Sequence, residues 1–396
     1  MSGSTDFATG AITGTSLATI TESAGAYAKV NYGAITAGDG VTSIAITGGT
    51  GSDVTTGAIT ASGSLIDTVS ITSGESSTTN SFGTIDANTG TIASVAHTVG
   101  FAAAAHTSTV SAAAITKATV SYGTGSTSSL TFGDATDGMV LSSLSLSGRP
   151  TSATVNLIGT SAVVTAAGIE GTSAVTITST LTGALSATGG PGADNISGGA
   201  GNDSLSGGGG GDTLAPGAGA DTVDGGAGTD TITLTVDGAS DVIRLATAAS
   251  SRDTVSDFLV GATNGDILRF ASGTSNAVAH GTTAAVAGDI ATAAAGSITA
   301  AAGVFVYRIG ANITGAASTD GTSLLAAVGG TITAASASDV LYFLVDDGAS
   351  TYVYRGAASG VTANTAITAD EIALVATLTG VADATAVVFN NIGFSG

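Results

Sequence analysis

The stretch that decides the fold runs from Gly189 to Ala215 and reads GGPGADNISGGAGNDSLSGGGGGDTLA. It consists of three nine-residue units, each with glycine at the first, second and fourth places and aspartate at the sixth. Glycine normally weakens an ordered structure, because the chain loses much conformational freedom when it folds. A repeated glycine pattern with one carboxylate per unit therefore indicates a backbone shape that needs glycine, with a negative charge at every repeat.

The same pattern, G-G-x-G-x-D-x-U-x with U a large apolar residue, extends over five consecutive units. The units begin at Gly189, Gly198, Gly207, Pro216 and Gly225, and only Pro216 departs from the glycine pattern. The sixth places hold Asp194, Asp203, Asp212, Asp221 and Asp230. The eighth places hold Ile196, Leu205, Leu214, Val223 and Ile232. Because the apolar residues stay in phase over all five units, the pattern does not fit a flexible glycine-rich linker.

Each unit divides into a six-residue turn and a three-residue strand whose eighth-place residue points inward. We expect two units to complete one turn of a flattened coil, so that apolar residues from both sides meet in a thin core. Glycine allows the turns to adopt left-handed backbone angles and to approach their neighbours closely. Ca²⁺ takes six or more oxygen ligands from carboxylates and carbonyls, and stacked units i and i+2 would supply both.

The predicted calcium ligands are the five sixth-place aspartates and backbone groups of the turns. The turn residues are Gly190, Gly192, Gly199, Ala200, Gly201, Gly208, Gly209, Gly210, Gly217, Ala218, Gly219, Gly226 and Gly228. In this scheme Asp212 serves two sites, one with Asp194 and one with Asp230, whereas Asp203 pairs only with Asp221. The array holds six acidic and no basic residues between Gly189 and Thr233, so we expect it to fold only when calcium binds.

These units resemble the repeats of the repeats-in-toxin (RTX) family. The segments DTVSDF and GDILRF that follow resemble the region that often comes after such arrays. The C-terminal segments DEIALVATLTGV and AVVFNNIGFSG are similar to family C-terminal regions that carry an uncleaved secretion signal. The resemblance implies bound calcium, export by the type I secretion machinery, and a secreted or cell-surface location in a Gram-negative bacterium.

The composition of the 396-residue chain narrows the possible partners. It has 29 acidic against 8 basic residues and a net charge of −21, so a nucleic-acid partner is excluded and a cation is favoured. The chain has no cysteine, and therefore neither disulfides nor thiolate metal sites. It has no apolar run of membrane-spanning length. Its start, MSGSTDFATGAITG, lacks the pattern of a Sec-type signal peptide.

Residues 1–188 form a region rich in Thr, Ser, Ala and Gly that is expected to be β-structured. Segments such as TSIAITGG from Thr42 and SAVTITST from Ser173 alternate apolar and hydroxyl residues, which is typical of strands with one buried face. The motif GAIT or a relative of it begins at Gly10, Gly33, Gly57, Gly83 and Ala113. Spacings of 23, 24, 26 and 30 residues predict a β-solenoid or stacked β architecture. A β-sandwich is the alternative.

Residues 234–396 have a different pattern and hold most of the Tyr and Phe residues. The segment from Asp253 predicts strand, loop and strand, and the segment from Ser338 predicts a hairpin with DDGAS as its turn. AAVAGDIATAAAGS from Ala284 is the best candidate for a short helix, and DEIALVATLTGV from Asp370 predicts a strand. The expected fold class is therefore all-β, with a β-solenoid at 1–188, an RTX parallel β-roll at 189–233 and a small β-rich domain with a minor helix at 234–396.

The sequence shows no catalytic motif. His97, His106 and His280 are scattered, and there is no H-E-x-x-H, no G-x-S-x-G and no P-loop. We expect His97 and His106 to lie on strand surfaces. A single GGTGSDVTT segment from Gly48 has no adjoining unit, so Asp53 is expected in a plain turn rather than in a calcium site. An enzyme is therefore not expected.

The acidic, cysteine-free chain with an RTX array resembles S-layer proteins of Gram-negative bacteria that are exported by type I secretion. This resemblance implies calcium-dependent self-assembly into a two-dimensional lattice or polymer, with a cell-surface polysaccharide as a further candidate partner. Two alternatives stay open at this point. One is an RTX adhesin or ice-binding protein, and the other is a secreted hydrolase with a cryptic site.

Overall fold

The computed structural model contains two compact units, Met1–Gly209 and Gly210–Gly396. It describes residues 6–395 apart from 9, 15–17, 39–40, 62–64, 104–105, 137, 246–251, 262–263, 272–289, 294–297, 300–305, 310–312, 314–316, 318–319, 334–339, 358–365 and 388–391. In this part of the chain, no helix combines the length and the apolar character that a bilayer crossing requires.

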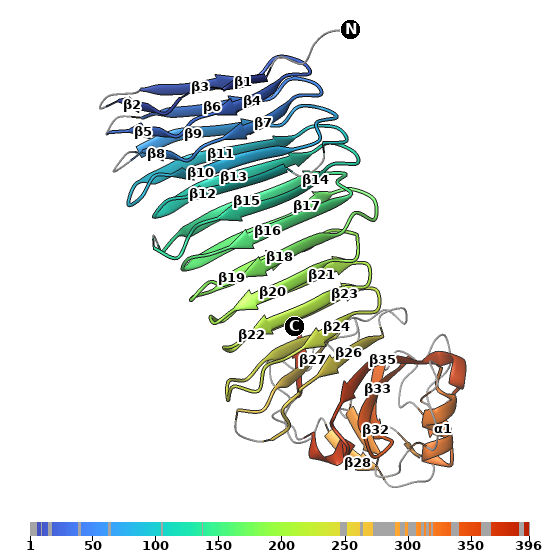
Figure 1. Ribbon diagram of the computed structural model, residues 1–396. Coiled ribbons are helices and arrows are strands. Elements are labelled where there is room, and N and C mark those ends of the chain that lie inside the picture. Colours follow the sequence, from blue (N-terminus) through green and yellow to red (C-terminus); the bar gives the residue numbers. More distant parts are fainter. Residues whose placement is uncertain are drawn as a thin grey trace. The chain divides into compact units, whose positions relative to one another are not determined.

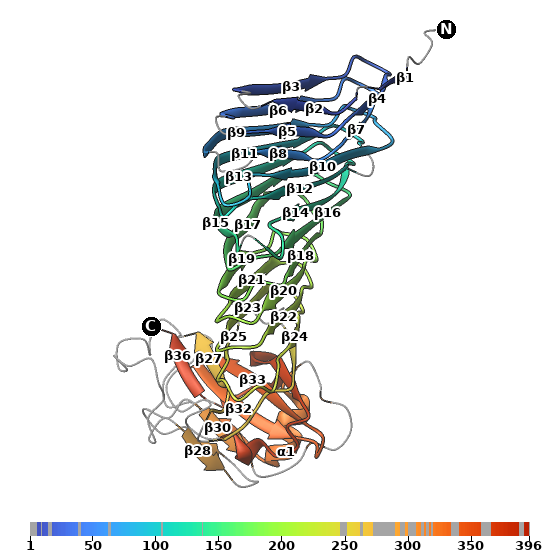
Figure 2. The same ribbon diagram turned by 60° about the vertical axis from the view of Figure 1, so that its left-hand side comes forward.

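The first unit is a parallel β-solenoid with two sheets, and its strands stack in chain order (Figure 1). One sheet contains β1 (Asp6–Ala8), β2 (Ile12–Gly14), β4 (Lys29–Tyr32), β5 (Ile35–Ala37), β7 (Asp53–Thr56), β8 (Ile59–Ala61), β10 (Asn80–Asp86), β12 (His106–Ser111), β14 (Thr127–Phe132), β16 (Ser152–Leu157), β18 (Val175–Ser179) and β20 (Asn195–Gly199). The other contains β3 (Thr19–Ser23), β6 (Ser43–Thr47), β9 (Leu65–Thr72), β11 (Thr91–Val99), β13 (Ala114–Tyr122), β15 (Val140–Gly148), β17 (Ser161–Ile169), β19 (Leu185–Thr188) and β21 (Ser204–Gly209). Figure 2 shows the two sheets from another side.

The GAIT motif marks successive turns of this solenoid. Ile12 pairs in register with Ile35, Ile35 with Ile59, and Ile59 with Ile85, so the isoleucines of four motifs form one column. This register confirms the predicted solenoid over the β-sandwich. The fifth match, AAIT, does not continue the column, because its Ile115 lies on β13 in the other sheet.

The prediction that His97 and His106 lie on strand surfaces is wrong. Both side chains are buried between the sheets, at 1% and 0% exposure, and their ring centroids are 5.8 Å apart. The ring centroid of Phe82 lies 5.1 Å from that of His106, and the ring centroid of Phe132 lies 6.1 Å from that of His97. Burial lowers the pKa of His106 to about 4, and burial together with the neighbouring His106 lowers that of His97 to about 3. Both imidazoles are therefore neutral at physiological pH.

The second unit begins with turns of a parallel β-solenoid whose strands are short. One sheet contains β22 (Thr213–Gly217), β24 (Thr231–Thr233) and β26 (Asp253–Ser256), and the other contains β23 (Thr222–Ala227), β25 (Val242–Leu245) and β27 (Ile267–Ala271). Two late strands continue these sheets in parallel. They are β35 (Ile372–Thr379), beside β26, and β36 (Ile392–Ser395), beside β27. Strands β26 and β27, with the loop between them, confirm the strand, loop and strand predicted from Asp253.

The rest of the second unit is a small domain with its own apolar core. Its elements are β28 (Ile290–Ala293), β29 (Ile298–Thr299), β30 (Val306–Ile309), α1 (Thr322–Val328), β31 (Ile332–Thr333), β32 (Val340–Asp346), β33 (Ser350–Ala357), β34 (Ala366–Ile367) and the 3₁₀ turns Ala369–Glu371 and Ala384–Ala386. The predicted hairpin is confirmed, because β32 and β33 pair antiparallel. The core includes Tyr307, Leu324, Phe343 and Tyr354.

The helix of this domain lies elsewhere than predicted. The described part of the candidate segment from Ala284 is the strand β28, which pairs in parallel with β30; the other residues of that segment lie outside the described part. Helix α1 instead begins at Thr322 and ends at Val328, and Gly329, with a left-handed φ of 66°, caps it. The alanine-rich sequence from Ala284 did not by itself distinguish a helix from a strand. Pairing with β30 stabilises the described part of it as a strand.

Candidate metal centre

The five sixth-place aspartates of the array are buried, which is unusual for charged side chains. Each is at most 2% exposed and lies directly before the strand of its own unit. The eighth-place residues, two positions further on, are buried as well, because alternate residues of a strand face the same side. Every unit therefore places one carboxylate and one apolar side chain on its inner side.

In the first unit these carboxylates tie neighbouring turns together. Oδ1 of Asp194 accepts a hydrogen bond from the backbone N–H of Val175 at 2.7 Å, and its Oδ2 accepts one from Gly190 at 2.5 Å. Asp203 repeats the arrangement with the N–H groups of Leu185 and Gly199, both at 2.7 Å. Each carboxylate thus orders its own turn and the strand of the preceding turn at once.

In the second unit the aspartates form a continuous ladder. The backbone N–H of Asp212 donates to Oδ1 of Asp230 at 2.8 Å, and the N–H of Asp230 donates to Oδ1 of Asp253 at 3.1 Å. On the opposite sheet, the N–H of Asp221 donates to Asp241 and that of Asp241 to Asp266, both at 2.9 Å. The ladder therefore continues beyond the glycine-rich repeats.

Sequence reasoning missed Asp241, Asp253 and Asp266. These side chains are buried at 2%, 1% and 3% exposure. Each begins a tripeptide with an apolar third residue, DVI, DTV or DIL, which repeats the sixth-to-eighth spacing of the array without its glycines. That tripeptide is the pattern that would have located them.

The glycine turns combine left-handed angles and close contacts, but not in every unit. Glycines at the second and fourth places of the last three units have φ between 97° and 140°; they are Gly208, Gly210, Gly217, Gly219, Gly226 and Gly228. In the first two units φ lies outside that region, so the expectation of left-handed angles is wrong there. Close approach explains those glycines, because a Cβ on Gly192 or Gly199 would overlap the carbonyl oxygen of Ser173 or Leu181.

The electrostatics of the array disfavour charged aspartates unless a cation is present. Burial raises the pKa of Asp194, Asp203 and Asp230 above the ordinary value. Burial, with the charge of neighbouring aspartates, raises the pKa of Asp241 and Asp253 to about 7. A bound divalent cation would reverse this trend, because it stabilises the ionised form of every carboxylate around it.

The residues present fit calcium. The Oδ2 atoms of Asp230 and Asp253 are buried and accept no hydrogen bond from the described residues, so these oxygens remain open to a cation. Backbone carbonyls crowd the same turns, since a Cβ added to Gly228 would overlap the oxygen of Gly210. Within the described ranges, no three His, Cys, Asp or Glu side chains form a metal cluster by themselves. Carbonyl oxygens would therefore complete each site, which suits an ion that takes six to eight oxygens.

The comparison with protein families agrees with this chemistry. Residues 188–223 and 207–234 match the family model of the RTX calcium-binding nonapeptide repeat (4 copies). The array is an RTX calcium-binding array. Calcium is its ion, and the Asp and turn residues named above are the ligands that we propose. No curated protein and no solved structure in the comparisons matches the chain.

The lone unit at Gly48 differs from the RTX units. Asp53 begins β7, and its carboxylate accepts hydrogen bonds from the N–H groups of Thr78 and Thr79 at 2.8 and 2.9 Å and from the Thr78 hydroxyl. Burial acts to raise the pKa of Asp53, but these hydrogen bonds outweigh burial and lower it. Asp53 thus lies at the start of a strand rather than in the expected turn, and its carboxylate is held by protein donors of the next solenoid turn.

One glycine pair tests the geometry of the RTX turns. Gly228→Ala should destabilise the array by about 2 kcal/mol or more, because φ is 140° and the new Cβ would overlap the Gly210 carbonyl. Gly209→Ala is the matched control, because alanine keeps the backbone carbonyl proposed as a ligand and its Cβ would lie 3.6 Å from the nearest atom, in Pro191. Thermal unfolding in calcium compares the two variants. Equal losses would contradict the proposed role of the fourth-place glycine.

Proposed function

We propose that the protein is a calcium-dependent, self-assembling structural protein of the bacterial cell surface, an S-layer protein or a related extracellular polymer. The observation that carries the proposal is the combination of an RTX array with a parallel solenoid whose outer faces bear small hydroxyl residues. Proteins with RTX repeats are typically secreted from Gram-negative bacteria. β-Rolls of this kind are typical of structural or adhesin-like proteins rather than of enzymes.

The outer face of one solenoid sheet is regular enough to support lateral contacts. Thr47, Thr72, Thr98, Ser121 and Ser147 pair in register on successive strands and form one column of hydroxyl side chains. Short side chains of this kind lose little rotamer freedom when they are covered, which lowers the entropic cost of an interface. The column therefore favours packing of one copy against another over a large, flat area.

Charge makes that packing depend on calcium. With a net charge of −21, copies repel one another over a screening length of about 8–10 Å at physiological salt. Sodium screens this repulsion but cannot bridge carboxylates, whereas Ca²⁺ collects oxygens from two neighbours at once. Mg²⁺ is a poor substitute, because it retains its waters and requires a tighter octahedron. Export by type I secretion would deliver the chain from low to high calcium.

The expected result is that purified protein stays monomeric in chelator and forms ordered sheets or tubes in millimolar calcium. Electron microscopy and light scattering should be compared in calcium, magnesium and sodium at matched ionic strength. Asp370→Asn, which removes one exposed carboxylate of the small domain, away from the hydroxyl column, is the control and should assemble like the parent. Persistent monomers in calcium, or the same sheets in sodium alone, would exclude the lattice.

The hydroxyl column also favours one second candidate, an ice-binding or adhesive RTX protein. A second column runs beside the first and contains Ser70, Ala96, Thr119, Ser145 and Thr165. Two parallel columns of hydroxyl groups on a flat sheet could order water, although Ala96 interrupts the second. Inhibition of ice recrystallisation by calcium-loaded monomers would favour this candidate over the lattice.

A further inference from the structure

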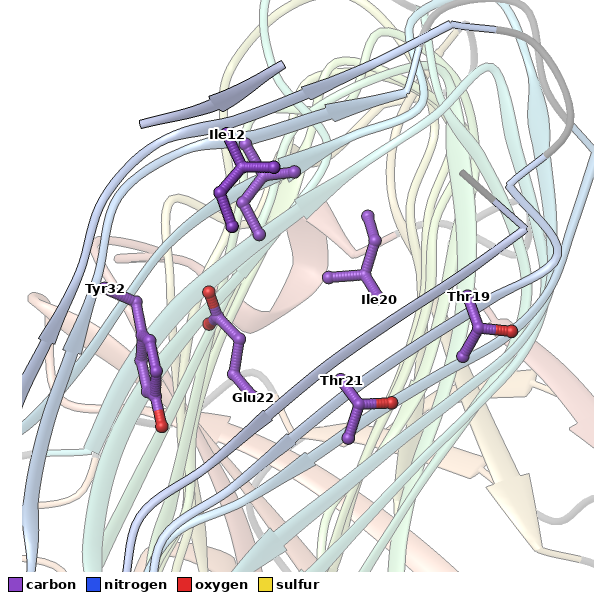
Figure 3. A pocket seen from close by; sticks show the side chains of 7 residues that line it. Ile12, Thr19, Ile20, Thr21, Glu22 and Tyr32 are labelled. Atoms are coloured by element: carbon purple, nitrogen blue, oxygen red, sulfur yellow. The ribbon is translucent and has the colours of Figure 1, made fainter. Parts of the chain in front are cut away.

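The first turns of the solenoid form a half-open cavity that the calcium array does not use. Its volume is about 330 Å³, and its lining residues are Ile12, Thr19, Ile20, Thr21, Glu22, Tyr32 and Ile35. Figure 3 shows the carboxylate of Glu22 directed from β3 towards the strand that carries Tyr32, whereas Thr19 and Thr21 point to the other side of β3. The side chains that face Glu22 in the wall are mainly apolar: Ile12, Ile20, Ile35 and the ring of Tyr32.

Glu22 faces inward because of its phase in β3. Exposed and buried residues alternate along Thr19–Ser23, and Glu22 shares the inner face with Ile20. The next two strands of the same sheet carry isoleucine at the equivalent position, since Glu22 pairs in register with Ile46 and Ile46 with Ile71. A carboxylate thus occupies a place in the column that apolar side chains fill in the following turns.

No described residue supplies a counterion to this buried carboxylate. Glu22 is 6% exposed, and its Oε2 accepts no hydrogen bond from the described residues. The Tyr32 hydroxyl does not serve it, because it donates to the carbonyl of Ser23 at 2.6 Å. Lys29 lies on the outer face of β4, where its charge acts on Asp53. A buried, unpaired carboxylate is costly, so the cavity favours a cation that can enter it.

We propose that this cavity binds a small organic ammonium ion. The ammonium group would donate hydrogen bonds to Glu22, the hydrocarbon part would pack on Ile12, Ile20 and Ile35, and the Tyr32 ring would add a cation–π contact. The volume is at the lower end of small-molecule sites. A single carboxylate in an apolar wall suits an organic monocation better than a divalent metal ion, which needs several oxygens. This site is independent of the proposed lattice function.

Ionisation of Glu22 links this binding to pH. Burial raises the pKa of Glu22 from 4.5 to about 7, and among the described residues of the pocket Tyr32 is the other titratable group. An ammonium ion binds the charged carboxylate, so affinity should rise between pH 6 and pH 8 and binding should release a proton. From a pKa of about 7, the charged fraction, and hence the affinity, increases about tenfold over that range.

The probe is phenethylammonium chloride, titrated calorimetrically into the full chain in calcium buffer. 2-Phenylethanol, which has a similar shape but no charge, is the control ligand. We expect saturable one-site binding of the ammonium ion, about tenfold tighter at pH 8 than at pH 6, and no comparable binding of the alcohol. Glu22→Gln should weaken binding at least about tenfold, whereas Glu170→Gln, at an exposed glutamate, should leave it unchanged.

The comparison of the two ligands on the parent protein needs no variant, so it holds even if Glu22→Gln folds poorly. Absence of saturable ammonium binding at pH 8 would overturn the proposal. Equal affinity for the alcohol would overturn it as well, because the cavity would then act only as an apolar crevice. If Glu22→Gln binds the probe normally but becomes dimeric in light scattering, Glu22 protects an open strand edge instead, and the ligand site is disproved.

Discussion

Removal of calcium with a chelator should unfold the RTX array and lower the thermal midpoint of the unit Gly210–Gly396 by on the order of 10–20 °C. Each site filled at a hundred times its dissociation constant adds about 2.7 kcal/mol, so two sites add about 5 kcal/mol. For a cooperative unit of about 150–250 residues, the range that includes Gly210–Gly396, 1 kcal/mol shifts the midpoint by about 2–4 °C. Without the ion, the buried Asp230 and Asp253 carboxylates lie close together with no compensating charge.

Circular dichroism and calorimetry with and without chelator measure this effect, and restoring calcium should reverse it. Magnesium at the same ionic strength is the control for nonspecific screening and should restore little. An unchanged midpoint in chelator would show that the array folds through its hydrogen-bonded ladder alone. The fit of the carboxylates to calcium would then have no role in stability.

Acidification should destabilise the solenoid through His97 and His106. Their folded pKa values of about 3 and about 4 lie below the ordinary 6.5, so the stabilising contribution is complete above pH 6.5. It is lost as the pH falls, because the unfolded chain binds the protons first. At pH 5 each histidine should cost about 2 kcal/mol, and the pair about 4 kcal/mol.

The double variant His97→Leu/His106→Leu isolates this contribution. Urea unfolding of the parent and of the variant at pH 7.5 and pH 5 should show a stability loss about 4 kcal/mol larger in the parent. The difference between the two proteins cancels the contribution of the carboxylates, which titrate in both. A parallel decline of parent and variant would mean that the two imidazoles are accessible to protons in the folded state.

The sequence predicts most of the architecture because equivalent residues of successive repeats pair with one another in the sheets. Alternation within β3, β6 and β9 follows from one buried face, and the spacing of the GAIT motifs corresponds to one turn of the solenoid. The nonapeptide likewise predicts that two units complete one turn, as the pairing of Leu214 with Ile232 confirms. In each of these cases local pattern and tertiary register agree.

The polar side chains inside the solenoid were harder to predict. His97 stands in the phase of Val95 and Val99, and Glu22 stands in the phase of Ile20, so alternation alone would have placed both inside. The polarity of histidine instead predicted that both rings lie on the strand surface. The alternation of buried and exposed positions was the more reliable signal for these residues. The position of the helix also escaped prediction, because tertiary pairing decided the structure of the alanine-rich segment.

The alternation of array strands between two sheets limits how such a protein can change length in evolution. Each nine-residue unit supplies one strand, so β22 and β24 lie in one sheet and β23 lies in the other. The strands after the array continue this alternation, with β26 in the first sheet and β25 and β27 in the second. Deletion of residues 216–224 would transfer every later strand to the opposite sheet, and the partners of β35 and β36 would exchange. Deletion of eighteen residues would restore the order. Descendants of this chain should therefore gain or lose array units in pairs.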